Sequence, residues 1–244
     1  MGISAISLLK TPISRGAALL SLAAVFTLAL LPDALAHGIG GKDAAFVAAS
    51  SGPQIIPFIY LGAKHMVTGY DHLLFLLGVI FFLYRLRHVV LYVTMFSIGH
   101  SITLLAGVLF GLNVNSFLVD AIIGLSVVYK AFDNLGGFQT LFGFQPNTKL
   151  AVLGFGLAHG FGLATKLQAL KLSPNGLLTN MVSFNVGVEL GQILALTVIL
   201  ALIIAWRKTP GFARNAVLAN VLIMVAGFAL IDYQLTGYFT NGHF

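Results

Sequence analysis

The chain has 244 residues, of which 58% are apolar and only 8% are Lys, Arg, Asp or Glu, whereas soluble domains carry roughly 25% charged residues. Its mean hydropathy is +0.97, so it has more apolar side chains than one water-facing globule of this size can bury. Lipid must be the solvent for much of its surface, which excludes a soluble enzyme. The sequence contains no Cys, so disulfides, Cys-ligated zinc and thiol catalysis are excluded. The net charge of +6 does not indicate nucleic-acid binding, because the basic residues are scattered between apolar runs.

The N-terminal segment has the features of a signal peptide. Lys10 and Arg15 precede an apolar run over residues 16–31, and Ala34-Leu35-Ala36 has the small-x-small form of a signal-peptidase site. We therefore expect residues 1–36 to be removed, so that the mature chain begins at His37, outside the cytoplasm. The alternative is an uncleaved first transmembrane helix, since the apolar run is nearly long enough to span a bilayer.

Six further apolar segments each come near or above the roughly 20 residues that cross a bilayer. They cover residues 55–84, 88–111, 116–135, 149–170, 177–206 and 212–236. The predicted fold class is all-α, a polytopic membrane helix bundle with about six transmembrane helices. An external segment over residues 37–53 precedes a single transmembrane domain over residues 54–244. Because the first segment is long and contains Pro57, Gly62 and Gly69, we expect its beginning to be a separate interfacial helix that bends into the membrane.

The loop charges predict an orientation. With the mature N-terminus outside, the loops on the cytoplasmic side carry more basic residues than the outer ones, as the positive-inside rule requires. Those inner residues are Arg85, Arg87, Lys149, Arg207, Lys208 and Arg214. We therefore expect a multi-pass protein of a bacterial-type inner membrane. Two G-x-x-x-G pairs, Gly156 with Gly160 and Gly187 with Gly191, would let their helices approach other backbones closely.

Four ionisable residues fall at a similar depth in four of the predicted spans. His72, His100, His159 and Glu189 each lie about ten to twelve residues from a span end, which is roughly 15–18 Å along a helix and near the centre of the hydrocarbon core. A carboxylate at that depth costs at least about 2.5 kcal/mol. These four groups should therefore face the interior of the bundle.

Helical spacing adds further polar residues to these four. His65 and His72 are seven residues apart and share one helix face, with Asp71 adjacent, and Asn185 lies four residues before Glu189. Convergent imidazoles with a carboxylate or amide match what a borderline divalent metal requires, and Asp71 could orient His72 or coordinate directly. The alternative is a polar network or proton relay without a metal.

Two more residues, predicted to lie near the outer surface, are candidates for binding or attracting a cation. As a new N-terminal residue, His37 would offer an α-amino nitrogen and an imidazole, a chelating pair suited to Cu(II) or Ni(II). Asp120 lies near the outer end of its span and could face a vestibule, where it would attract cations. Lys130 and Asp133 are spaced as an ion pair within one helix, which indicates a structural role.

The motifs resemble those of the HupE/UreJ family of small membrane proteins associated with hydrogenase and urease. Residues 65–72 have the H-x5-D-H form, and the stretches 99–101, 128–134, 156–160 and 184–189 look like the UreJ-like branch. The likeness runs from about Gly52 to Asp232. It implies nickel permeation, with His65, Asp71 and His72 as the motif residues. In a later motif the nickel permeases have two His, whereas this chain keeps one His-Gly, His159-Gly160.

The sequence therefore favours a divalent-metal permease, with nickel as the favoured ion and copper or zinc as alternatives. Its site would combine the midplane residues with those of the motif, and with His37: His37, His65, Asp71, His72, His100, His159, Asn185 and Glu189. One alternative is a metal-bearing or structural subunit of a larger membrane complex; the permease could also assemble into such a complex or into a homo-oligomer. The other is an intramembrane zinc hydrolase, although no helix carries H-E-x-x-H. The expected partners are the lipid bilayer and the metal ion.

Overall fold

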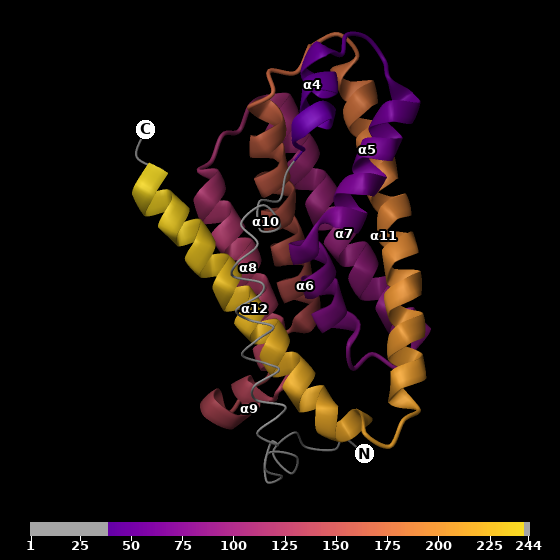
Figure 1. Cartoon of the computed structure of the whole chain (residues 1–244), viewed down its shortest axis with the longest axis vertical. Helices are drawn as coiled ribbons and strands as arrows, with labels where there is room; N and C mark the ends of the chain where they lie inside the picture. Colours follow the sequence, from indigo (N-terminus) through magenta and orange to yellow (C-terminus); the bar gives the residue numbers. More distant parts are fainter. Residues whose placement is uncertain (1–38, 242–244) are drawn as a thin grey trace.

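The computed structural model describes residues 39–241, and this range is helical, with no β-strand (Figure 1). The helices in chain order are α4 (Gly41–Ala49), α5 (Ile55–Thr68), α6 (Tyr70–Ile80), α7 (Leu86–Phe110), α8 (Ser116–Asn134), α9 (Gly137–Phe142), α10 (Thr148–Gln168), α11 (Leu177–Arg207) and α12 (Phe212–Asn241). The all-α prediction is confirmed. The predicted signal peptide and His37 lie outside the described residues. The short helices α4 and α9 were not predicted.

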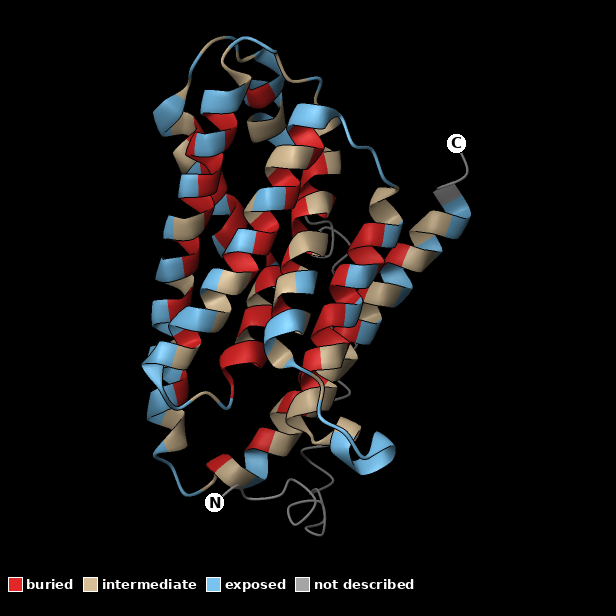
Figure 2. Ribbon diagram, turned by 180° about the vertical axis from the view of Figure 1, so that it is seen from behind, coloured by how far each residue is buried: buried red, intermediate tan, exposed pale blue. Residues whose placement is uncertain are grey.

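The long helices have the length and surface of membrane spans. Within the described range, α7, α10, α11 and α12 are long and apolar enough to cross a membrane. Helix α8 has 19 residues but carries Asp120, Lys130 and Asp133. Large apolar side chains such as Phe110, Ile193 and Leu202 are exposed on the outside of the bundle, where exposed and buried residues alternate along the helices (Figure 2). An outer surface of this kind requires lipid, so the chain is a multi-pass membrane protein.

The first predicted span is two helices rather than one. Helix α5 ends at Thr68, Gly69 has an extended conformation with φ −75° and ψ 94°, and α6 begins at Tyr70. The expected separate helix at the beginning of this segment is α5, and the break that ends it falls at Gly69, near the middle of the segment. Pro57 lies in the first turn of α5, where an absent N–H removes no intrahelical hydrogen bond. Gly69 therefore interrupts the chain inside the bundle.

Glycines set the spacing of the most extensively paired helices, which are α5 with α11, α7 with α10, and α8 with α12. A methyl group at Gly160 would lie 2.2 Å from the carbonyl oxygen of His100, and one at Gly187 would lie 2.0 Å from that of Ile59. The predicted close approach at both G-x-x-x-G pairs is confirmed. The Thr103 hydroxyl also donates to the carbonyl of Leu157 at 2.7 Å, which fixes the register of α7 against α10.

Polar contacts close the bundle at both ends. At the end with α4, which we call the outer end, the Asn180 amide donates to the carbonyl of Gly52 at 3.0 Å and accepts from the N–H of Gln54 at 2.6 Å. At the opposite, inner end, the Arg207 guanidinium donates to the carbonyls of Leu83 and Ile80, both at 2.9 Å. Arg207 thus adds hydrogen bonds to carbonyls at the end of α6 and in the turn that follows it. Which end faces the cytoplasm stays a prediction from the loop charges.

Replacing Gly160 by Ala tests the glycine contacts. The added methyl would overlap the carbonyl oxygen of His100, so α7 and α10 must separate, and we expect the free energy of unfolding to fall by about 1–3 kcal/mol. Gly154 is the control on the same helix, because a methyl there has no atom within 4 Å. Gly154→Ala should be neutral or stabilising by about 0.4–1 kcal/mol. Thermal unfolding in detergent measures both, and equal stabilities for the two variants would contradict the packing described here.

Candidate metal centre

Three histidines from three helices meet inside the bundle. His65 is in the last turn of α5, His72 is the third residue of α6, and His100 lies midway along α7. Each is at most 5% exposed. One ring nitrogen from each lies within 4.8 Å of the others, and the ring centroids are 5.2 Å apart for His65 and His72, 5.6 Å for His72 and His100, and 6.4 Å for His65 and His100. We call these three residues the histidine group.

The break at Gly69 brings the first two members together. In one continuous helix, residues seven apart are separated by about 10 Å along the axis, and the sequence predicted such a separation for His65 and His72. The structure places their ring centroids 5.2 Å apart instead. The end of α5 and the start of α6 thus present both rings to the same point, where α7 adds His100.

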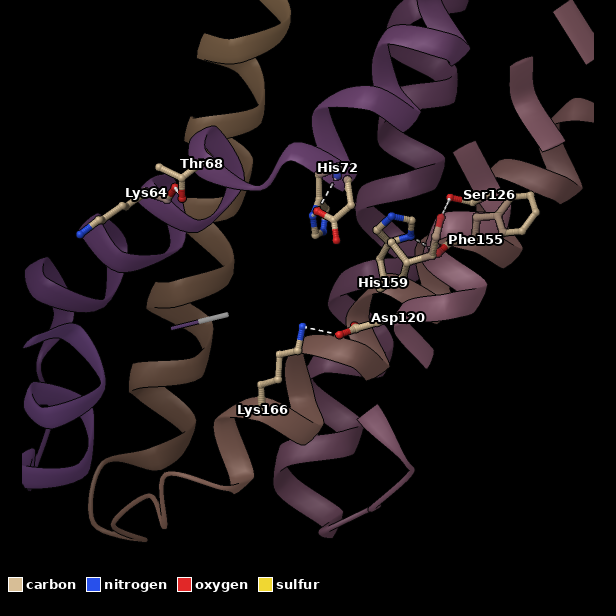
Figure 3. Close-up of polar contacts among 10 residues, drawn as sticks. Lys64, Thr68, His72, Asp120, Ser126, Phe155, His159 and Lys166 are labelled. Carbon is tan, nitrogen blue, oxygen red and sulfur yellow. Dashed lines mark hydrogen bonds and ion pairs between the residues drawn. The ribbon is translucent and has the colours of Figure 1, made fainter. Parts of the chain in front are cut away.

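His159 of α10 lies beside the histidine group. Its ring centroid is 4.7 Å from that of His72, and it is fully buried. Its Nδ1 lies 2.7 Å from the carbonyl oxygen of Phe155 (Figure 3). A carbonyl can only accept, so Nδ1 carries the proton in this contact and the lone pair of the neutral ring is on Nε2. The close packing at Gly160 is what brings this ring toward α7.

Asp71 orients His72. Its Oδ1 accepts from the His72 ring Nδ1 at 3.0 Å and from the His72 backbone N–H at 2.8 Å. A carboxylate that binds Nδ1–H leaves the lone pair of the neutral imidazole on Nε2, the usual arrangement behind a metal-ligating His. Asp71 is in the first turn of α6, where the helix dipole favours a negative charge. The structure therefore gives Asp71 an orienting position behind His72.

The other predicted site residues lie elsewhere or outside the described range. Glu189 of α11 is half-buried and lies beside Ser97, outside the histidine group. The Ser97 hydroxyl donates to Gln192 at 2.8 Å, which joins α7 to α11. Asn185 is buried and donates to the carbonyl of Met181 at 2.9 Å. His37 is not among the described residues.

The sequence reasoning missed three phenylalanines on the inner side of the histidines. Phe75 lies 5.4 Å from Phe96 and 5.7 Å from Phe155 between ring centroids. Each is one helical turn from a histidine, toward the inner end: Phe75 follows His72 by three residues, and Phe96 and Phe155 precede His100 and His159 by four. A spacing of three or four residues puts each Phe on the same helix face as its His, so the sequence could have predicted this arrangement. We call these residues the phenylalanine layer.

Comparison with known proteins fits the arrangement. A family model described as HupE / UreJ protein matches residues 41–242. The chain belongs to this family. No curated protein and no solved structure matches it. The resemblance read from the H-x5-D-H motif is confirmed, and the three polar residues of that motif in this HupE/UreJ protein are the ones that converge at the break between α5 and α6.

Asp71→Asn tests the orienting contact in this HupE/UreJ protein. Asparagine keeps the size of the side chain but removes the charge that holds the His72 Nδ1–H, so we expect the affinity for Ni²⁺ to fall about 10- to 100-fold. Isothermal titration of the purified full chain in detergent measures this. Asp43→Asn is the control, because Asp43 forms its ion pair with Lys64 and not with a histidine, and both side chains of that pair are partly exposed. An unchanged affinity in Asp71→Asn would remove Asp71 from the site.

Proposed function

We propose that this chain binds a divalent transition-metal ion, with nickel favoured, and passes it across the membrane. The observation that supports this most is the histidine group, which offers three buried nitrogen ligands from three different helices within 4.8 Å of one another. Neutral imidazoles suit borderline ions such as nickel, copper and zinc. The HupE/UreJ family carries the expectation of nickel or cobalt transport, which favours nickel among them.

A conduit fits the ligand set better than a permanent site. Transport requires the ion to leave again, so its ligands should be few and should bind it loosely enough to release it. The histidine group has neutral ligands, and the nearest carboxylate, Asp71, is engaged with the His72 ring. The sequence contains no G-x-x-x-x-G-K-[ST] motif. The driving force we propose is therefore the membrane potential or the concentration gradient.

The phenylalanine layer supports a closed inner side. Phe75 and Phe96 are at most 1% exposed, and their rings, with that of Phe155, lie between the histidines and the inner end. A constriction lined by such rings excludes water and hydrated ions. An ion held by the histidines must displace these rings to leave by that side. In the transport proposal, this arrangement is the state that is closed toward the inner end.

Two other functions use the same residues. A metal-bearing subunit of a larger complex would keep its ion, and an intramembrane zinc hydrolase would need an open coordination position that activates water. Neither has a specific observation in its favour. Both predict a stoichiometric metal that stays bound, which makes them separable from a permease by experiment.

His100→Ala is the test of the histidine group. Purified full-length protein in vesicles loaded with a metal-sensitive dye should take up Ni²⁺, and His100→Ala should reduce the uptake at least about tenfold because one of few ligands is lost. His88→Ala is the control on the same helix, since His88 lies in the first turn of α7 near the inner loop and should leave uptake unchanged.

The same vesicle experiment can contradict the transport proposal. If wild-type protein moves no nickel, cobalt, zinc, copper or manganese under any imposed potential, yet retains one equivalent of metal through dialysis, the transport proposal is wrong and a fixed site replaces it. If it neither binds nor moves any of these ions, the histidines form a network without a metal.

The phenylalanine layer makes a separate prediction. Phe96→Ala should widen the constriction and admit water, so vesicles with this variant should leak Mg²⁺, which binds imidazole poorly, while wild-type vesicles should not. Phe110→Ala is the control, because Phe110 ends the same helix and is 77% exposed. Tight vesicles with Phe96→Ala that still take up Ni²⁺ at the wild-type rate would show that the layer is packing alone.

A further inference from the structure

An ion pair on the outer side of the histidine group plays no part in the function proposed above. The Lys166 ammonium of α10 lies 2.7 Å from Oδ2 of Asp120 on α8, and the two side chains are 22% and 9% exposed. Figure 3 shows this pair on the outer side of His72 and His159. Burying two charges in a membrane bundle is costly, so the pair calls for a reason beyond helix packing.

Helix α10 connects the pair to the histidines. Lys166 follows His159 by seven residues, so the two side chains share a face of α10 about 10 Å apart along the axis. Between them lies Gly162, where an added methyl group would come within 3.2 Å of the Asp120 Oδ1. Asp71 and His72 are also within electrostatic range of the Asp120 carboxylate. Asp120 therefore lies between the histidine group and the outer end of the bundle.

The second oxygen of Asp120 is a buried acceptor. Among the residues that the structure describes, none donates a hydrogen bond to Oδ1, although this atom is fully shielded from solvent. An unsatisfied carboxylate oxygen in this setting is unfavourable. It is also a hard, anionic ligand that could bind a divalent cation or the water of its hydration shell.

A charge count relates this acceptor to the proposed cargo. Three neutral imidazoles do not balance a divalent ion, whereas Asp71 and Asp120 together supply two negative charges. While Lys166 stays on Asp120, one of those charges is already neutralised, and an ion at the histidines would leave the interior with a net positive charge. The Lys166 stem is flexible and partly exposed, so its ammonium can move outward into water.

We propose that Asp120 is an outer relay site for the divalent cation and that Lys166 is a tethered competing cation, which the metal displaces as it moves toward the histidine group. This inference rests on the transport function proposed above. When the metal binds Asp120 it replaces the ammonium of Lys166, so the carboxylate has a counter-charge at that step. In the absence of metal, Lys166 keeps other cations off the site.

Two substitutions of Lys166 should change the affinity for Ni²⁺ in opposite directions. Lys166→Gln keeps a hydrogen-bond donor beside Asp120 but removes the competing charge, so we expect the dissociation constant and the concentration for half-maximal uptake to fall about tenfold. Lys166→Arg keeps the charge and offers a bidentate fork to both oxygens, so both quantities should rise about tenfold. Titration and vesicle uptake of the purified full chain measure them.

The controls separate a relay from a structural ion pair. Lys64→Gln removes the same charge from a more exposed Lys–Asp pair of the same 2.7 Å length, whose side chains are 43% and 27% exposed, and its effect measures the general loss of positive charge. Asp120→Asn should weaken binding about tenfold, and adding Lys166→Gln to it should not tighten binding, because the carboxylate for which Lys166 competes is gone.

The outcomes that overturn the relay differ from those that overturn transport. If Lys166→Arg behaves as wild type, or if Lys166→Gln tightens binding no more than Lys64→Gln does, the pair is structural. Recovery of wild-type affinity in the double variant leads to the same conclusion. If size-exclusion chromatography shows that Lys166→Gln is not folded, the affinity of Lys166→Arg still decides between a relay and a structural ion pair. Wild-type protein that neither binds nor moves Ni²⁺ contradicts the function proposed for the histidine group instead.

Discussion

The break at Gly69 is the feature on which the candidate metal centre depends. A membrane interior offers no water to satisfy open backbone groups, so helix ends are tolerated there only inside the protein. In this chain the gap is one residue long, and the Gly69 N–H still bonds to the carbonyl of His65 at 2.9 Å while its own carbonyl accepts from Leu73 at 3.0 Å. The interruption thus costs little, and it moves His72 to within ligand distance of His65.

Close glycine packing supplies the remaining partners. Because Gly160 lets the carbonyl of His100 come into contact with it, α10 lies directly against α7, and the ring centroid of His159 lies 4.7 Å from that of His72. Gly187 lets the backbone of α5 approach α11 in the same way. Small residues of this kind take the place of the hydrophobic driving force, which is absent between helices in lipid. The positions of all four histidines therefore depend on glycines, at the break between α5 and α6 and at the close helix contacts.

The sequence predicted the helical membrane fold and the family, but not which side of its helix each polar residue faces. Composition and apolar length were enough for an all-helical membrane protein, and H-x5-D-H was enough for the family and for Asp71 beside His72. Counting residues from a span end gives depth but not which side a residue faces, so it grouped Glu189 with the histidines, whereas the structure places it beside Ser97. The sequence named Pro57, Gly62 and Gly69 as residues that could interrupt the first segment, but it did not single out Gly69. Pro57 is the stronger helix breaker, yet it is harmless in a first turn.

Helix α6 has one end at the break and one end held by other helices. Its inner end is held by Arg207 of α11, which donates to the carbonyls of Ile80 and Leu83, and by Asn134 of α8, which donates to that of Gly78 at 2.8 Å. Its outer end joins α5 at Gly69, where the backbone leaves the helical conformation. Asp71 and His72 both belong to α6, so the carboxylate that holds the ring tautomer of His72 is carried by the same helix as the ring. Two half-helices that meet at a break can bring together two candidate ligands that one straight helix with the same seven-residue spacing would hold about 10 Å apart along its axis.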